Sequence, residues 1–246
     1  MTANLFPRGL SQPREGFRFA VDSLLLSVFL TPREGDRILD LGCGCGVIGL
    51  GMLLAHPDKH LQLLGVDNNP EMIEHARENS SRLHLVSQTS FKILDAAELN
   101  SQVLAPESWD TVLMNPPYRM PGTGRTPGHS SKRAATFGSE LQVEHFFQAA
   151  SFALKKKGIA GMVCPASRLD HILAGLNQYF LKPKQILPVH GRPNKAAKLV
   201  LIQARKSGGS HLEISFPLTL YDDHNRLTSQ AQSFCPYLAC NVQRES

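Results

Sequence analysis

The feature that most constrains the fold is a short apolar segment that runs directly into a glycine-rich turn. Arg37–Leu41 has the length and apolar content of a buried strand, and Gly42–Gly49 follows it without a break. We expect a helix over Leu50–Ala55 to come next. In such a unit the glycines let the backbone approach a ligand, and the helix N-terminus offers unpaired N–H groups. The segment therefore predicts an α/β fold with a ligand at the turn.

Apolar segments of strand length alternate with amphipathic segments of helix length over most of the chain. This alternation predicts an open α/β sheet, in which polar groups at the carboxyl ends of parallel strands share one rim. We expect strands at Leu61–Val66, Ser90–Leu94, Trp109–Met114, Ile159–Cys164, Lys184–Val189, Lys198–Gln203 and, at an edge, Leu212–Leu220, with helices at Ser23–Leu30, Pro70–Asn79, Glu140–Lys155 and Leu169–Phe180. Asp22 is expected to cap the first helix, and Lys156 and Lys157 to form the solvated end of the helix at Glu140–Lys155.

Length and composition predict one domain with a substantial core. Of the 246 residues, 42% are hydrophobic and 19% are charged, which is typical of a folded globular chain. Within a single domain over 1–246 we expect an irregular N-terminal arm at 1–16, a basic substrate flap at 119–138 and a C-terminal extension at 207–246.

Charge and cysteine content indicate the kind of partner and the cellular compartment to expect. A net charge of +5 favours a polyanionic partner. The five cysteines are scattered and lack the paired spacing of a zinc site, so we expect reduced thiols and no metal. The start of the chain lacks a secretory pattern, and the longest apolar run, Leu41–Ala55, is short and broken by glycine. We expect a cytoplasmic protein with no membrane anchor and no obligate protein partner.

The glycine turn fits two cofactor patterns. Gly44-x-Gly46-x-x-Gly49 satisfies the dinucleotide pattern, whereas Asp40-x-Gly42-x-Gly44-x-Gly46 satisfies that of S-adenosylmethionine binders. A tight strand-to-helix turn without any ligand is a third interpretation. The turn alone does not choose among them.

Acidic residues follow the next two strands. Asp67 is placed to accept both hydroxyls of a ribose, and Asp95 could accept from an adenine amino group. Each could instead cap the helix or turn that follows it. With Asp40 and Asn115, these side chains would line one crevice at the carboxyl rim of the sheet.

The tetrapeptide Asn115-Pro116-Pro117-Tyr118 closes the strand at Trp109–Met114. Two consecutive prolines stiffen the backbone and stop the strand, although Asn-Pro is also an ordinary turn signal. The Asn115 side-chain oxygen and the Pro116 carbonyl could accept the two hydrogens of a planar amino group, which favours a pyramidal and more nucleophilic nitrogen. Tyr118 offers a face on which a base could stack. We therefore interpret the tetrapeptide as a site where a planar nitrogen is methylated, with Asn115, Pro116 and Tyr118 as its catalytic residues.

With the glycine turn, the acids and this tetrapeptide in that order, the chain resembles the S-adenosylmethionine-dependent N-methyltransferases of the Asn-Pro-Pro-Tyr class. Within that class it is most similar to the bacterial tRNA (adenine-N6)-methyltransferases that act on an adenine beside the anticodon of a valine tRNA. The similarity covers most of residues 10–225, and the chain departs from the family pattern at 132–137, where a basic-His-Glu element is expected. The matching segments are Gly16–Leu26, Pro165–Leu169, Pro188–His190, Lys195–Leu201 and Pro217–Asp222.

The resemblance implies a Rossmann-like class I methyltransferase: a mostly parallel seven-stranded sheet with helices on both faces and an antiparallel edge strand. It also implies S-adenosyl-L-methionine as the cofactor and a tRNA anticodon loop as the partner. The implied cofactor-binding residues are Phe19, Asp22, Asp40, Gly42, Gly44, Gly46, Asp67, Asn68, Asp95, Ala96 and Asn115. Basic residues expected to contact RNA phosphates are Arg125, Lys132, Arg133, Arg192, Lys195 and Lys198.

Four other functions remain open on the sequence. Protein-glutamine N5-methyltransferases share the tetrapeptide, but they carry a helical recognition domain for which residues 1–36 are too short. Guanine-N2 rRNA methyltransferases are associated with Phe at the position of Tyr118. An NAD-binding oxidoreductase or a non-catalytic RNA-binding module could also use the glycine turn.

Overall fold

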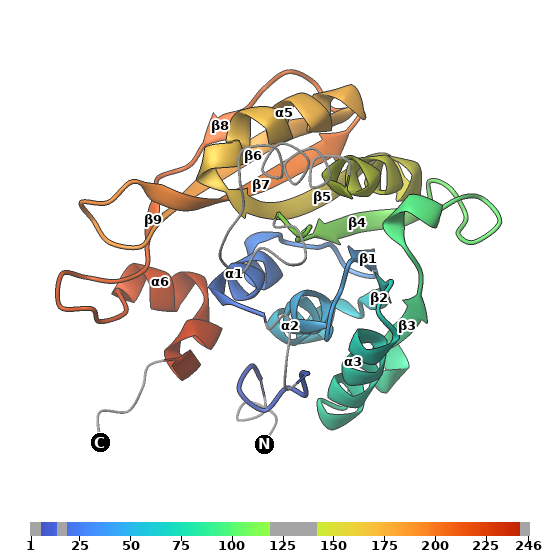
Figure 1. The fold of residues 1–246 in the computed structure, drawn as a ribbon, viewed down its shortest axis with the longest axis horizontal. Helices are drawn as coiled ribbons and strands as arrows, with labels where there is room; N and C mark the ends of the chain where they lie inside the picture. The colour runs from blue at the N-terminus through green and yellow to red at the C-terminus, as the bar shows by residue number, and fades with distance from the viewer. Residues whose placement is uncertain (1–5, 14–18, 119–141, 242–246) are drawn as a thin grey trace, which may run out of the picture.

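The computed structural model describes residues 6–13, 19–118 and 142–241. A central sheet separates two layers of helices (Figure 1). Helices α1 (Val21–Phe29), α2 (Val47–Ala55) and α3 (Pro70–Arg82) cover one face. A helix over 142–153 and α5 (Leu169–Gln178) cover the other. Helix α6 (Ser229–Phe234) lies beside α1, and short 3-10 turns occupy Pro57–Lys59, Val86–Gln88, Ala96–Glu98, Ala166–Arg168 and Pro236–Asn241.

The sheet has the order β3-β2-β1-β4-β5-β7-β6-β8, and β9 also pairs with β6. The strands at β1 and β4 begin and end where the sequence predicted, and the others differ by a few residues. Their bounds are β1 Arg37–Leu41, β2 Gln62–Asp67, β3 Thr89–Ile93, β4 Trp109–Met114, β5 Leu154–Pro165, β6 Leu181–His190, β7 Ala197–Lys206, β8 Glu213–Ile214 and β9 Leu218–Thr219.

The Rossmann-like, mostly parallel architecture with helices on both faces is confirmed, but the place of the antiparallel strand differs from the prediction. Strand β7 is antiparallel to both β5 and β6 and lies between them, inside the sheet. The reason is the short connection between β6 and β7, which only an antiparallel pair can use. The expected edge strand at 212–220 is two short strands, β8 and β9, both parallel to β6. Within the described part of the chain they bring the sheet to nine strands instead of seven.

Side chains from adjacent strand positions enter separate cores on the two faces of the sheet. Ile38 of β1 and Leu113 of β4 join the cluster under α1, α2 and α3. Leu39 and Val112 join the cluster under the helix at 142–153 and α5. This alternation is the period of two that a strand imposes. Because both faces are buried, β1 and β4 are held in register and their carboxyl ends are fixed side by side.

The lysine run does not end a helix as expected. The helix stops at residue 153, and Lys155, Lys156 and Lys157 belong to β5. Lys155 Nζ lies 2.6 Å from Asp110 Oδ1, so the run is tied to the start of β4. Pairing of β5 with β4 and β7 thus outweighs the helical pattern of these residues. Among the described residues, none of the helices has the length and apolar character to cross a membrane.

Candidate active site

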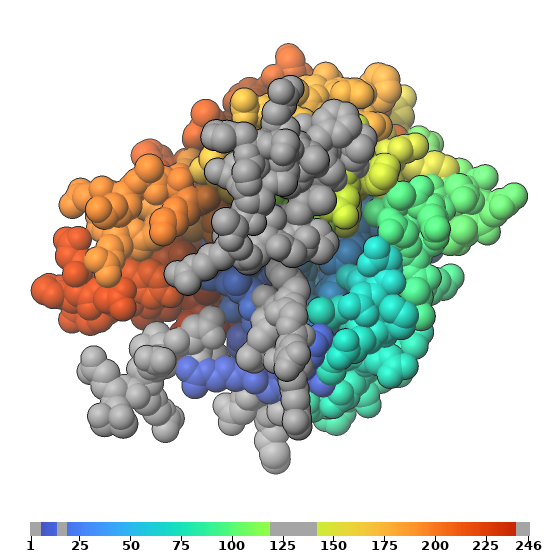
Figure 2. All heavy atoms as spheres, viewed as in Figure 1, coloured from blue at the N-terminus to red at the C-terminus, as the bar shows by residue number. Residues whose placement is uncertain are grey.

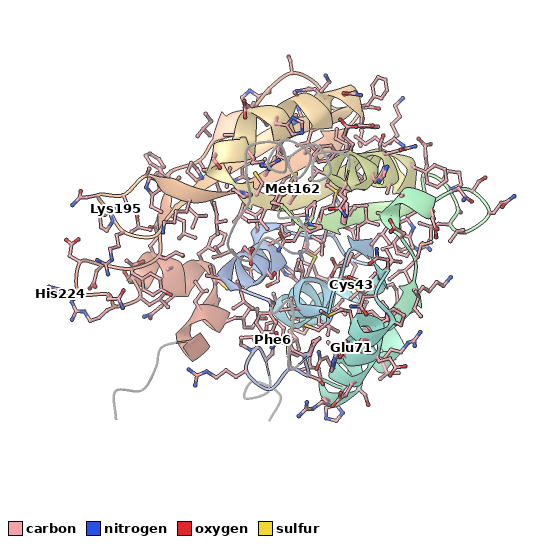
Figure 3. The ribbon with its side chains drawn as sticks, in the orientation of Figure 1. Phe6, Cys43, Glu71, Met162, Lys195 and His224 are labelled. Atoms are coloured by element: carbon pink, nitrogen blue, oxygen red, sulfur yellow. The ribbon has the colours of Figure 1, made fainter. Side chains whose placement is uncertain are left out.

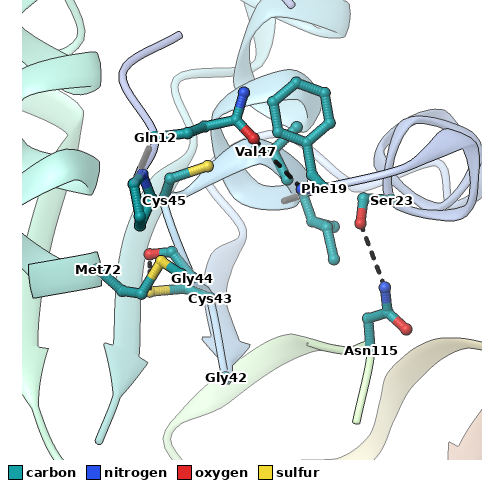
Figure 4. Close-up of a pocket in the computed structure, with 12 residues that line it drawn as sticks. Gln12, Phe19, Ser23, Gly42, Cys43, Gly44, Cys45, Val47, Met72 and Asn115 are labelled. Atoms are coloured by element: carbon teal, nitrogen blue, oxygen red, sulfur yellow. Dashed lines mark hydrogen bonds between the residues drawn. The ribbon is translucent and has the colours of Figure 1, made fainter. Parts of the chain in front are cut away.

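A pocket opens where the carboxyl ends of β1 and β4 meet the N-terminal arm (Figure 4). The glycine turn forms its floor, Asn115 lies on one side, and arm residues lie on the other. The lining residues are Gln12, Pro13, Phe19, Ser23, Gly42, Cys43, Gly44, Cys45, Val47, Ile48, Met72 and Asn115.

The glycine turn adopts a backbone that other residues rarely adopt. Gly42, Gly44 and Gly46 have φ angles of +66°, +53° and +85°, and Gly46 immediately precedes α2. A Cβ on Gly42 would lie 3.0 Å from the ring of Phe146, whereas Gly44 has no atom within 4 Å of such a position. The backbone at Gly44 therefore faces open space, where a ligand can approach it closely.

Asp40 supports the turn from behind. Its side chain is fully buried, and Oδ2 accepts a hydrogen bond of 3.0 Å from the N–H of Gly49 in the first turn of α2. Oδ1 is buried without a hydrogen-bond partner among the described residues. Burial, with a smaller contribution from the charge of Asp67, raises the pKa of Asp40 to about 7. The expected direct contact of Asp40 with a cofactor remains a prediction, and the geometry favours a supporting role.

Asp67 links the glycine turn to the next helix. Its Oδ2 accepts a 2.9 Å hydrogen bond from Gly44 N, and its Oδ1 accepts one of the same length from Asn69 N. Asn69, not Asp67, caps α3, because its side chain accepts from Glu71 N. The alternative of Asp67 as a helix cap is therefore wrong. The contact with a ribose remains a prediction, and each carboxylate oxygen keeps a further lone pair for it.

Asn68 and Asp95 form a second polar group beside Asp67, at the ends of β2 and β3. Asn68 Nδ2 donates to Asp95 Oδ2 at 2.9 Å. Asp95 also caps the short turn that Ala96 begins, since its Oδ1 accepts from Ala97 N. The capping alternative for Asp95 is thus confirmed, and a role in binding adenine remains a prediction.

The tetrapeptide stands directly after β4. Asn115 Nδ2 donates to Ser23 Oγ at 3.2 Å, and the oxygen end of the same amide points away from Ser23 (Figure 4). Pro116 is buried and Pro117 is exposed. The Tyr118 hydroxyl donates to the backbone oxygen of Val163 in β5 at 2.7 Å. Burial raises the pKa of Tyr118 well above its ordinary value, so the phenol remains a neutral donor that anchors the ring.

The N-terminal arm forms a pocket wall that the sequence did not predict. Buried Asn79 of α3 accepts from Ser11 N at 2.6 Å and donates to the backbone oxygens of Ser11 and Cys45. Gln12 Oε1 accepts from Phe19 N at 3.3 Å. A polar Asn79 among the buried positions of an amphipathic helix was the available signal for this contact.

Phe19 and Asp22 occupy different positions relative to the pocket. Phe19 lines it, as expected of a residue that contacts the ligand. Asp22 does not cap α1, because Ala20 is the residue before the helix and has no capping side chain. The carboxylate of Asp22 instead accepts a 2.7 Å hydrogen bond from Ser23 N, inside the first turn. Its predicted contact with the cofactor remains a prediction.

The basic residues expected to contact RNA divide into two groups. Arg125, Lys132 and Arg133 lie outside the described residues. Arg192 and Lys195 are exposed at the turn between β6 and β7, and Lys198 is exposed at the start of β7. Figure 2 shows this turn beside residues 220–230 at one end of the molecule, and Lys195 and His224 project there in Figure 3.

A family model described as a methyltransferase domain matches residues 32–174, which is more than half of the chain. The chain belongs to this methyltransferase family. Two curated relatives carry the name tRNA1(Val) (adenine(37)-N6)-methyltransferase. The one from Actinobacillus succinogenes is 26% identical over 220 residues, covering 89% of each chain. The one from Bacteroides thetaiotaomicron is 26% identical over 192 residues, covering 75% of each.

Solved structures of other methyltransferases share the fold of this methyltransferase. A predicted O-methyltransferase from Agrobacterium tumefaciens superimposes with a TM-score of 0.69 at 21% identity, covering 88% of this chain and 96% of that one. A SAM-dependent O-methyltransferase from Thermotoga maritima has a TM-score of 0.54 at 18% identity, covering 80% and 68%. An oxidoreductase or a non-catalytic RNA-binding module is therefore not favoured for this chain.

Proposed function

We propose that this protein is an S-adenosylmethionine-dependent methyltransferase that modifies the exocyclic N6 of an adenine in tRNA, beside the anticodon of a valine tRNA. The observation that carries the proposal is the position of Asn115, whose amide lies on the wall of the same pocket as the glycine turn. The names of the relatives identify tRNA and adenine as the acceptor. Glutamine side chains and guanine N2 are less favoured acceptors for the same reason.

The residues of the pocket fit the cofactor. Gly44 leaves space for close approach to the backbone, and Asp67 stands at the tip of β2 with lone pairs for hydroxyl donors. Phe19, Val47, Ile48 and Met72 supply an apolar surface for the uncharged parts of the ligand. S-adenosylmethionine supplies an activated methyl group when bound, so the protein needs chiefly to position the acceptor.

The tetrapeptide supplies the acceptor groups. Asn115 Oδ1 and the Pro116 carbonyl oxygen each accept a hydrogen bond from one N–H of the adenine amino group. These two hydrogen bonds direct the lone pair of the nitrogen toward the methyl donor. Pro116 has no N–H that would compete for the base. Tyr118 presents a ring whose hydroxyl is fixed to Val163, and stacking of a base on such a ring contributes roughly 1–3 kcal/mol.

The basic turn between β6 and β7 suits the RNA backbone. Because β4 and β6 run in the same direction, Arg192 and Lys195 follow a strand end on the same rim as Asn115. Arg192 Nη2 donates to Asn225 Oδ1, which joins this turn to the next loop. An anticodon loop is single-stranded, so turning one adenine into the pocket costs less than extruding it from a duplex.

The proposal is tested with the purified protein, S-adenosylmethionine carrying a labelled methyl group, and two valine tRNA transcripts. The first has the natural anticodon loop, and the second has guanine in place of the adenine beside the anticodon. We expect N6-methyladenosine by nucleoside mass spectrometry in the first transcript only. Equal methylation of both would place the modification elsewhere, and labelling of neither would refute the tRNA activity.

Cells lacking the protein provide the second test. We expect their valine tRNA to lose N6-methyladenosine beside the anticodon, and we expect the wild-type protein, but not Asn115→Ala, to restore it. Restoration by Asn115→Ala would show that Asn115 is a turn residue without a catalytic role.

A further inference from the structure

Ser23 contacts Asn115 from α1, although 92 residues separate the two in the chain. Ser23 is the third residue of α1 and is only 2% exposed. Its hydroxyl oxygen accepts a hydrogen bond from the Asn115 amide, with 3.2 Å between Oγ and Nδ2. Neither the family match nor the tetrapeptide assigns a role to this serine.

The contact matters because the two ends of an amide are chemically opposite. Nδ2 is a donor and Oδ1 is an acceptor, and rotation of the side-chain amide by about 180° exchanges them. A target amino group brings N–H donors, so only the orientation with Oδ1 toward the pocket can hold it. In the exchanged orientation, amide hydrogens would face amine hydrogens.

Asp22 gives the Ser23 hydroxyl a preferred direction. Asp22 Oδ1 accepts from Ser23 N at 2.7 Å and lies 3.4 Å from Ser23 Oγ. A carboxylate can only accept, so the hydroxyl hydrogen turns toward Asp22 and the hydroxyl lone pairs remain for Asn115 Nδ2. Asn115 Nδ2 thus donates to Ser23 Oγ, and Ser23 Oγ donates to Asp22 Oδ1. Because Ser23 is buried, removal of its hydroxyl leaves Asn115 Nδ2 without this protein acceptor.

We propose that Ser23 is a positioning residue that fixes the Asn115 amide with Nδ2 inward and Oδ1 toward the acceptor nitrogen. The inference rests on the proposed function, since it takes Asn115 as the group that receives the target amine. It also gives Asp22 a role that does not require contact with the cofactor. Ser23 acts on the reaction through Asn115.

The test compares Ser23→Ala with Ser27→Ala. Ser27 lies on the same helix, is fully buried, and donates its hydroxyl to Leu24 O at 2.7 Å without touching Asn115. We expect Ser23→Ala to lower kcat about tenfold while the Kd for S-adenosylmethionine and the KM for tRNA stay within about twofold. Ser27→Ala should retain the wild-type kcat, and Ser23→Thr, which keeps the hydroxyl, should restore most of it.

Two further measurements separate positioning from other roles. In an Asn115→Ala background, Ser23→Ala should cause no further loss of kcat, because the serine acts through that amide. In ¹⁵N-labelled protein, the Asn115 side-chain NH₂ resonances, identified by their absence in Asn115→Ala, should shift in Ser23→Ala and not in Ser27→Ala. Additive losses, an equal kcat for the two alanine variants, or unshifted resonances would each overturn the proposal. If the wild-type protein methylates no tRNA, the proposed function fails, while the resonances still decide whether Ser23 orients Asn115.

Discussion

The buried Asp40 should make the stability of the protein depend on pH in a direction opposite to that of most carboxylates. An exposed aspartate has a pKa of 3.8, and burial raises the pKa of Asp40 to about 7. Between these values the folded protein keeps a proton on Asp40 that the unfolded chain releases. Stability is therefore greatest below about pH 4 and is lost as the pH rises toward about 7.

The magnitude follows from the size of the shift. A difference of about 3 pKa units, at about 1.4 kcal/mol per unit, corresponds to a loss of about 4 kcal/mol of unfolding free energy between pH 4 and pH 8. Asp40→Asn imitates the neutral acid and keeps an oxygen for the Gly49 N–H. We expect this variant to exceed the stability of the wild type by only about 2 kcal/mol at pH 5 and by about 4 kcal/mol at pH 8, because the wild type loses about 1.4 kcal/mol for each pH unit between the two pKa values.

The measurement is urea unfolding at pH 5, 6, 7 and 8 without cofactor, followed by the fluorescence of Trp109. This residue is the single tryptophan of the chain and is 5% exposed, so it reports unfolding of the sheet. Asp58→Asn, at an exposed turn, makes the same change of charge without burial and controls for net charge. A stability difference between wild type and Asp40→Asn that does not change with pH would refute the reasoning, even if the variant were less stable throughout.

Asp67→Ala should raise the Kd for S-adenosylmethionine about 10-fold to 100-fold in calorimetry, because hydrogen bonds to a charged group are lost; an unchanged Kd would leave Asp67 a purely structural role. Tyr118→Phe should cost about 1 kcal/mol of stability through the lost bond to Val163 and keep most activity, whereas Tyr118→Ala should reduce kcat/KM at least tenfold. Equal losses of activity in the two variants would argue against stacking. Arg192→Ala and Lys195→Ala should each make the plot of the logarithm of the tRNA binding constant against the logarithm of salt concentration less steep, by about 1 in slope. Unchanged slopes would place the RNA elsewhere.

The strand ends of the first half of the fold could be predicted because local patterns decide them. Arg37–Leu41 and Trp109–Met114 are buried over most of their length and are followed by glycine or by Asn-Pro-Pro, so their ends depend little on neighbouring elements. The second half was harder to predict. Lys155–Lys157 continue a helical pattern but belong to β5, because the residues on either side of them pair with distant strands: Leu154 with Trp109 and Ile159 with Arg205, each more than 40 residues away in sequence. The position of β7 inside the sheet also depends on those distant pairings.

The candidate site shows the same division between local and distant information. Gly42, Gly44 and Asn115 reach the pocket because each follows a strand directly, and strand ends of a parallel sheet meet at one rim. The contacts of Ser23 and Asn79 depend on how α1 and α3 pack against the rest of the fold, and no residue spacing in the sequence indicates that packing. Both are polar residues at buried positions of amphipathic helices, where an unpaired polar group would be costly. A buried polar side chain on an apolar helix face therefore predicts a hydrogen-bond partner, which is local for Ser27 and distant for Ser23 and Asn79.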